Sequence, residues 1–572
     1  LFAIFFLAFC LPQTGYAQAI DPRDYHGAWE AKLDARTFTQ RVTLAREAGN
    51  KWRVRMANSQ LFFDKVVTNT GSDEIKLALG EGLDFRGTLA ADGTELVGFL
   101  TSMDTRYRLT LKRNEAGQYV GEWKSFYFSE LQPAKLYLSV YVWRGSRFEA
   151  YPVLGDDRYR GTYAVEFQQE GTAVSFLDRR AGYRFAGQLR GDTIELDLFL
   201  GGERVTHTPL KFFRSTEEWT RGTSAISRVA RPQSPPERHD GWETGTVTEV
   251  GQNTALLDRL VDSIEADALV NLHCVLIAHR GKLVYENYFN GWHADLLQDQ
   301  RSAAKSIASA LVGVALKEGV LGDVDDPLYD YLPEEYQATK DARKARITLE
   351  HLLTMRSGLE ITTPNGNEGL AGEDYYQETD QWLSTVLRAP MAHEPGSYCQ
   401  YGSANPFLLG VALASQLSEP LDDYLHDRIF GPLGITDYSL PVDTDGRPYF
   451  GGGTYLRPRD MLKFGEMYRQ GGVWRGRRVI PEAWVEQSWT KHTRLQNGAG
   501  NPYGYQFWHQ DYPVGKRTYA AVEARGAGGQ YISVIPELEL TLVITSGNYR
   551  NGRYWQPRHI IERYLLPVFG GE

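Results

Sequence analysis

Cysteine is scarce in this chain, with three residues among 572. So few cysteines exclude a disulfide framework. Cys10 lies in an N-terminal segment that we expect to be removed, which leaves Cys274 and Cys399. The sequence leaves open whether these two pair. Clusters of His and Cys with zinc-ligand spacing are also missing, so we expect neither a metal nor an organic cofactor.

Long apolar runs and basic runs are equally rare. Beyond residues 1–19 no apolar stretch is long enough to span a bilayer, so we expect no transmembrane span after signal removal. The formal net charge is −10, and no basic run stands out, which argues against nucleic acid as a partner. At 572 residues the chain is too long for one core, so it is expected to be multidomain.

Residues 1–19 differ from the rest of the chain. They carry no charge, begin with an apolar run, and end in the small-x-small sequence Ala17-Gln18-Ala19. This pattern predicts a signal peptide and therefore a secreted or periplasmic protein. The alternative is a short N-terminal anchor.

Residues 24–215 alternate apolar and polar residues between Gly and Asp-Gly turns, which predicts an all-β domain. An internal repeat has an offset of 100 residues, with Phe85-Arg-Gly-Thr-Leu89 matching Phe185-Ala-Gly-Gln-Leu189. Gly27-Ala-Trp29 and Gly121-Glu-Trp123 correspond at a slightly smaller offset. We expect an internally duplicated barrel or sandwich. It is interpreted as an accessory domain, with carbohydrate or lipid binding as the alternative.

A predicted linker covers residues 216–239 and contains the Pro-rich sequence 231–237. From there to residue 572 the pattern changes to mixed helix and strand, which indicates a second domain at 240–572. We expect the β-rich segment to fold separately and to lie outside the active site.

Ser302 and Lys305 open the most informative segment. The residues after Ser302 contain many Ala and Leu, no Pro and one Gly, which predicts a buried helix. Residues three apart share a helix face, so a hydroxyl and an amine would lie together as nucleophile and base. The alternative is a structural Ser beside a Lys whose stem packs on the core. A second Ser-x-x-Lys, Ser488 and Lys491, lacks a following apolar helix and is interpreted as surface.

Five ordered segments resemble the class C β-lactamase and penicillin-recognising serine hydrolase family. They are residues 302–305, 347–359, 395–403, 452–460 and 526–529. The resemblance implies a β-lactamase/transpeptidase-like α/β domain, in which an antiparallel sheet is flanked by helices and joined by a helical subdomain.

The resemblance also implies roles for single residues. Ser302 would form an acyl-enzyme, Lys305 would accept its proton, and Tyr401 would be a second acid/base group acting as a phenolate. The N–H groups of Ser302 and Ala527 would form the oxyanion hole. His351 and His393 are expected to be structural.

Ser403, Arg525, Gly526 and Gly528 are the expected substrate-binding residues. The sequence departs from lactam-binding members in having Ser403 in place of Asn and Ala524 in place of a cation. Arg525 is expected on the opposite strand face from Ala524. The group that would hold a substrate carboxylate is therefore missing at position 524.

These observations predict an exported serine hydrolase that cleaves a small ester or amide and is esterase-like. The alternatives are a β-lactamase or D-amino-acid peptidase, and a non-catalytic envelope protein that binds a ligand with the same fold. The sequence leaves the acyl group, the leaving group and the oligomeric state open.

Overall fold

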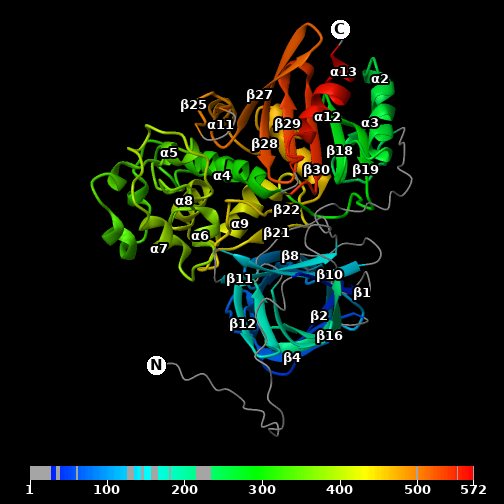
Figure 1. Cartoon of the computed structure of the whole chain (residues 1–572), viewed down its shortest axis with the longest axis vertical. Helices are drawn as coiled ribbons and strands as arrows, with labels where there is room; N and C mark the ends of the chain where they lie inside the picture. The colour runs from blue at the N-terminus through cyan, green and yellow to red at the C-terminus, as the bar shows by residue number, and fades with distance from the viewer. Residues whose placement is uncertain are drawn as a thin grey trace.

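The computed structural model describes residues 27–33, 39–58, 62–124, 134–143, 147–155, 165–179, 182–213, 234–496, 500–549 and 552–570. The predicted signal peptide and most of the predicted linker lie outside these residues. Within them, no helix is both long and apolar enough to cross a membrane. In Figure 1 the blue-to-cyan part consists of strands, and the green-to-red part mixes helices with a second group of strands.

Strands β2 to β9 form the first sheet of the β-rich region. Buried apolar and exposed polar side chains alternate along strands such as β3 and β5, so one face of this sheet is buried. The order in space is β4-β3-β2-β9-β8-β7-β6-β5. The bounds are β2 (Thr39–Arg46), β3 (Lys51–Ala57), β4 (Phe62–Thr68), β5 (Ile75–Gly80), β6 (Leu83–Leu89), β7 (Glu95–Ser102), β8 (Thr105–Arg113) and β9 (Tyr119–Lys124).

The second sheet combines seven later strands with the first strand of the described chain. Its order is β11-β10-β1-β16-β15-β14-β13-β12. The bounds are β1 (Gly27–Leu33), β10 (Ala134–Trp143), β11 (Arg147–Gly155), β12 (Val165–Glu170), β13 (Ala173–Asp178), β14 (Tyr183–Arg190), β15 (Thr193–Leu200) and β16 (Glu203–Phe213).

The expected all-β region is confirmed, and the internal repeat follows the strands. The 100-residue offset aligns β6 with β14 and β7 with β15. By the same alignment β1 takes the place of β9, since β9 pairs with β8 and β2 while β1 pairs with β16 and β10. The equivalent side chains Trp29 and Trp123 are both buried in one shared core.

The second half is built on a nine-stranded sheet that is antiparallel except where β17 runs parallel to β19. Its order is β17-β19-β18-β30-β29-β28-β27-β26-β25. The bounds are β17 (Glu243–Thr244), β18 (Leu272–His279), β19 (Lys282–Tyr288), β25 (Thr493–Arg494), β26 (Pro502–Tyr503), β27 (Trp508–Val514), β28 (Arg517–Gly526), β29 (Gln530–Ile535) and β30 (Leu540–Ser546).

Helices cover both faces of this sheet, as expected. Along β18, Leu276 belongs to the core beneath α4 (Lys305–Glu318) and α10 (Pro458–Arg469). Its neighbours Val275 and Ile277 belong to the core on the other face of the sheet. That face is covered by helices from the beginning and the end of this half of the sequence. Full burial of one such side chain stabilises the fold by about 1.5–3 kcal/mol. The covering helices are α2 (Val247–Val250), α3 (Ala255–Glu265), α12 (Gln556–Ile560), η8 (Ile561–Leu565) and α13 (Leu566–Phe569).

A helical subdomain lies between β19 and β25 in the sequence and packs on α4 (Figure 1). Its α-helices are α5 (Leu349–Leu353), α6 (Glu373–Tyr376), α7 (Trp382–Leu387), α8 (Ala404–Ala414), α9 (Leu421–Leu425) and α11 (Glu482–Ser488). Its short turns and ribbons are η3 (Leu328–Asp330), η4 (Glu334–Thr339), η5 (Lys344–Arg346), η6 (His426–Phe430), β23 (Val473–Trp474) and β24 (Arg477–Arg478).

One feature was not expected from the sequence: the first β sheet continues into the second half. Strand β21 (Ser439–Pro441) pairs with β8, β22 (Tyr455–Leu456) pairs with β21, and β20 (Gln298–Asp299) pairs with β22 (Figure 1). Strand β20 ends three residues before Ser302. A continuous ladder of backbone hydrogen bonds therefore runs from the β-rich region to the segment that carries Ser302.

Buried charge also joins the two regions. Asp422 has no exposed surface and accepts hydrogen bonds from Arg86 at 2.8 Å and from Arg106 at 2.9 Å. Arg86 pairs with Asp423 as well. The predicted division into domains at 24–215 and 240–572 stays a prediction, but these contacts connect the two regions much more closely than a Pro-rich linker suggests.

Candidate active site

Ser302 lies in a 3₁₀ turn, η2 (Arg301–Ala304), and not in the first turn of α4 as expected. Arg301 adopts a left-handed backbone with φ of 48°, which is unfavourable for a side chain of this size and sharpens the entry to the turn. A Cβ on Gly526 would collide with Gln300 O, and one on Gly452 would stand 3.5 Å from Ser302 N. Glycine at these positions lets β28 and the segment before β22 approach the serine closely.

Lys305 supplies the amine expected beside this serine. Its Nζ donates to Ser302 Oγ at 3.1 Å, to Ser403 Oγ at 2.9 Å and to the carbonyl oxygen of Gly451. The residue is 1% exposed. Burial lowers the pKa of Lys305 to about 8, and the negative charge of Glu373 partly opposes this shift. A lysine with this pKa can accept and return a proton near neutral pH.

Tyr401 lies beside the same two residues. Its ring centroid is 5.3 Å from Lys305 Nζ. Burial raises the pKa of Tyr401 well above its usual value, and a hydrogen bond to the Ser302 side chain counteracts only part of the rise. The phenol therefore keeps its proton at neutral pH, which does not favour the phenolate role expected from the family resemblance.

Ser403, expected to contact substrate, is buried and faces Lys305. Its hydroxyl donates to Glu373 Oε2 at 2.8 Å, and Tyr449 donates to Glu373 Oε1 at 2.7 Å. Sequence reasoning did not identify Glu373. The residue opens the four-residue helix α6 in a segment without a recognised motif, and only the tertiary packing brings it to Ser403.

Arg525, another expected substrate-binding residue, is already bonded within the protein. Its Nε donates to Glu523 at 2.6 Å, and its guanidinium lies 5.2 Å from the ring centroid of Trp508. Gln510 accepts a further hydrogen bond at 3.0 Å. The side chain is 11% exposed. Most of its hydrogen-bonding capacity is therefore committed to these neighbours.

Ala524 lies in the core between the sheet and α10, and it is 1% exposed. Position 524 therefore packs into this core and offers no cation to a substrate carboxylate. Arg525 does lie on the opposite face of β28, as the alternation of a strand requires.

Ala527 and the glycines around it follow the end of β28. Ala527 is exposed, and Gly526 lies against the backbone of η2. Gly528 and Gly529 have φ of 81° and 97°, and a Cβ at either would collide with the side chain of Tyr549 or Ser546. This segment is therefore held against η2, as an oxyanion hole shared with Ser302 would require.

The second Ser-x-x-Lys was interpreted as surface, which holds for the exposed Lys491 and is wrong for Ser488. Ser488 is fully buried at the end of α11, and its hydroxyl donates to Trp484 O at 2.7 Å. Both Cys274 and Cys399 are buried free thiols. His351 caps α5 by accepting from Thr348 N, in keeping with a structural role.

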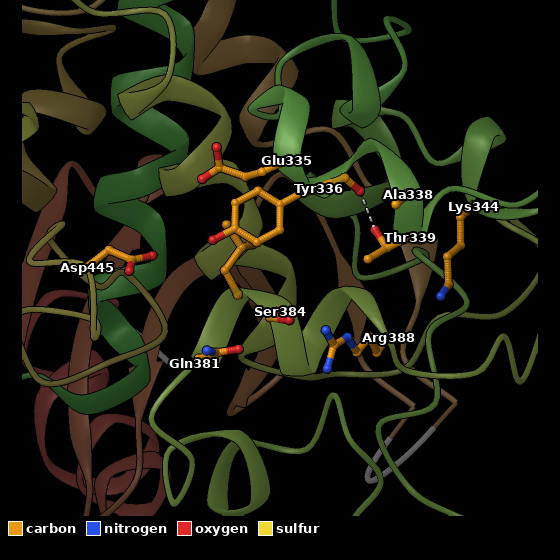
Figure 2. Close-up of a pocket in the computed structure, with 10 residues that line it drawn as sticks. Glu335, Tyr336, Ala338, Thr339, Lys344, Gln381, Ser384, Arg388 and Asp445 are labelled. Atoms are coloured by element: carbon orange, nitrogen blue, oxygen red, sulfur yellow. Dashed lines mark hydrogen bonds between the residues drawn. The ribbon is translucent and has the colours of Figure 1, made fainter. Parts of the chain in front are cut away.

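A cavity of about 570 Å³ lies elsewhere, in the helical subdomain (Figure 2). Tyr336 and Thr339 of η4 line one side, and Gln381 and Arg388 line the other. Ser302 is not among its lining residues, so we do not place the chemistry there. In the part of the chain described by the structure, no group of His, Cys, Asp and Glu gathers to hold a metal.

The family model described as Beta-lactamase matches residues 257–562, which is more than half of the chain. This chain belongs to the beta-lactamase family. The matched residues include the Ser302, Lys305 and Tyr401 cluster, and they exclude the whole β-rich region.

Two curated relatives match over shorter stretches, and a solved structure matches over about half of the chain. A "Putative D-alanyl-D-alanine carboxypeptidase" of Escherichia coli K12 is 32% identical over 114 residues, covering 20% of this chain and 26% of the relative. A 6-aminohexanoate-dimer hydrolase of Paenarthrobacter ureafaciens is 25% identical over 278 residues, covering 46% of this chain and 66% of the relative. The crystal structure of a family VIII carboxylesterase is 16% identical with a TM-score of 0.43, covering 55% and 96% of the two chains. The chain thus spans about a quarter of the first relative's length.

Proposed function

We propose that this protein is an exported serine hydrolase that cleaves an uncharged ester or amide through an acyl-enzyme on Ser302. The observation that carries the proposal is the buried Lys305, whose amine is bonded to Ser302 Oγ and has a pKa near 8. Membership of the beta-lactamase family supports it. The signal-peptide pattern of residues 1–19 supports export.

Acylation begins from neutral Lys305. The amine takes the proton from Ser302 as Oγ attacks the carbonyl carbon, and the N–H groups of Ser302 and Ala527 stabilise the oxyanion. The leaving group then receives a proton, which Lys305 passes through the hydroxyl of Tyr401. In this account Tyr401 remains a neutral phenol, donating one proton while accepting another.

Deacylation repeats these steps with water. Lys305 is neutral again once the leaving group has departed, so it can take a proton from a water that attacks the acyl carbonyl. The proton returns to Ser302 Oγ as the acid is released. No group outside Ser302, Lys305 and Tyr401 has to change protonation.

Each cation next to the nucleophile already faces a carboxylate. Arg525 is bonded to Glu523, and Arg301 lies 2.8 Å from Asp299. Lys305 is connected to Glu373 through the hydroxyl of Ser403. A substrate carboxylate would have to compete with these partners, whereas an ester or amide without charge would not. This supports an esterase-like or amidase-like activity over β-lactamase or carboxypeptidase activity.

An amidase is the second candidate within the same mechanism, because a relative that matches 46% of this chain is named as a hydrolase of the 6-aminohexanoate dimer. Amides and esters differ mainly in how strongly the leaving group needs protonation. Loss of the Tyr401 hydroxyl should therefore slow amide cleavage more than ester cleavage.

The test is intact-mass analysis after treatment with a fluorophosphonate, together with a panel of p-nitrophenyl esters, anilides and a chromogenic cephalosporin. We expect one phosphonyl adduct, mapped to Ser302, and faster turnover of uncharged esters than of the cephalosporin. An unlabelled protein, or efficient cephalosporin hydrolysis, would contradict the proposal.

A further inference from the structure

We propose that Glu373 is a positioning residue that orients the hydroxyl of Ser403 and stabilises the protonated form of Lys305 during acyl transfer. This inference rests on the proposed function. It concerns a residue outside the Ser-x-x-Lys and Tyr-x-Ser segments.

Three consecutive hydrogen bonds connect the nucleophile to this carboxylate. Lys305 Nζ lies 3.1 Å from Ser302 Oγ and donates to Ser403 Oγ at 2.9 Å. Ser403 in turn donates to Glu373 Oε2 at 2.8 Å. A serine hydroxyl has one proton and two lone pairs, and it can rotate to suit either neighbour. With its proton directed to the carboxylate, the hydroxyl must present its lone pairs to Lys305.

The carboxylate is itself held in place from the other side. Its second oxygen accepts from Tyr449, and the hydroxyl of Tyr449 lies 2.6 Å from that of Tyr376. Both tyrosines are fully buried. Burial and the charge of Glu373 raise the pKa of Tyr449 well above its usual value, so this phenol stays a donor. Glu373 therefore has both oxygens occupied by donors, which fixes it toward Ser403.

The charge of Glu373 acts on the proton affinity of the amine. Burial alone would lower the pKa of Lys305 further, and Glu373 is the group that raises it. When Ser302 transfers its proton, a positive charge forms at the buried Nζ, where solvent screens it little. A carboxylate one hydroxyl away stabilises this ion without bonding to it directly, so the amine remains free to face Ser302.

Other titratable groups surround the pair and must be distinguished from it. Tyr401 lies over Lys305, and Glu368 and Asp374 lie near Glu373. Burial, followed by the charge of Asp374, raises the pKa of Glu368 to about 7, so this carboxyl could also titrate in the working range. Glu368 accepts from Tyr375 N, and within the described part of the chain no hydrogen bond joins it to Ser403, which makes it the matched control.

The experiment measures the rate of phosphonylation of Ser302 by a fluorophosphonate between pH 5.5 and 10, in the full chain. In this reaction Oγ bonds to phosphorus, fluoride leaves, and Lys305 takes the proton. The wild-type rate should rise with an apparent pKa near 8. In Glu373→Gln the midpoint should fall by about one unit or more, and the plateau rate should drop by about tenfold.

Two further variants separate the inference from a structural effect. Ser403→Ala interrupts the same connection and should also lower both the midpoint and the plateau rate. Glu368→Gln should leave the midpoint where it is. Thermal unfolding of each variant checks that the fold is kept, and Glu373→Asp should restore part of the plateau rate.

The outcomes are distinguishable. No labelling of the wild type at any pH contradicts the proposed function itself. Labelling with an unmoved midpoint in Glu373→Gln overturns the inference and leaves the proposed function standing. A midpoint that moves in Glu368→Gln and not in Glu373→Gln assigns the titration to Glu368 and also overturns the inference.

Discussion

The β-rich region and the catalytic half use charge in different ways. In the β-rich region, pairs such as Arg53 with Asp64 lie at the surface, where the arginine side chain is 44% exposed. In the catalytic half, Arg459 and Glu286 pair at 3% and 2% exposure. Surface pairs contribute little to stability, whereas an interior charge is costly unless it is paired and hydrogen-bonded. The catalytic half therefore contains buried charges whose cost depends on their pairing, whereas the surface pair of the β-rich region contributes little.

The largest effect should come from the nucleophile. Ser302→Ala should lower kcat/KM for a p-nitrophenyl ester by about a thousandfold or more, as removal of an acyl-forming serine does elsewhere. Ser488→Ala is the matched control, because this second serine of a Ser-x-x-Lys sequence is buried and should leave turnover nearly unchanged. Retained activity in Ser302→Ala would contradict the assignment of the site.

Removal of the β-rich region should have the next largest effect. A chain that begins at Arg238 would leave β21 without β8 and Asp422 without its arginine partners. Because β20 and β22 continue the same ladder to Ser302, we expect kcat/KM to fall by about a hundredfold, as small misplacements of reacting groups cause. Steady-state kinetics measures kcat/KM, and circular dichroism checks that the shortened chain is folded. Full activity would instead show that the region is separable, as the sequence predicted.

A single substitution can test the junction between the two regions. Asp422→Asn removes one partner of a buried pair, and we expect about 3 kcal/mol less stability toward urea. Asp64→Asn, in the exposed pair of the β-rich region, should cost about 0–1 kcal/mol. Equal losses in the two variants would remove the distinction between buried and surface charge drawn above.

Two histidines should have pKa values that are shifted in opposite directions from the ordinary value. Burial, and then the charge of Arg108, lowers the pKa of His426 to about 4. A hydrogen bond to Asp197 raises the pKa of the half-exposed His207 above 6.5. Stability from neutral His426 is present above pH 6.5 and is lost as pH falls toward 4, whereas that from protonated His207 is lost as pH rises. NMR titration of the two imidazoles would check this, and coincident midpoints would contradict it.

The sequence predicted what is local and periodic. The helix after Ser302 and the alternating strands of the β-rich region both follow from short patterns, and the structure has them. Glu373 could not be found in this way, because its contact with Ser403 joins residues 30 positions apart through tertiary packing. The packing of Ala524 in the core beneath α4 and α10 could not be predicted either, because glycines alone do not determine which face of a strand a neighbouring residue occupies.

The extension of the first sheet through β21 and β22 was not predictable for a related reason. Strands of two or three residues carry too little alternation to be recognised. The strand of the first sheet that pairs with β21, β8, lies more than 300 residues earlier in the chain. Such pairings depend on how two large regions dock, which no local sequence pattern encodes.

The place of β1 has a consequence for the order in which the chain folds. Among the described strands β1 is synthesised before all others, yet its partners β10 and β16 follow only after the eight strands of the first sheet are complete. Until these partners are synthesised, β1, which is the equivalent of β9, could pair with β8 and β2 in place of β9. Contacts so distant in sequence form slowly and leave strand edges exposed to wrong partners. The pairing of β1 with β10 and β16 should therefore limit the rate of refolding. A chain that begins at Thr39, and so lacks β1, should refold its first sheet faster than the full chain does.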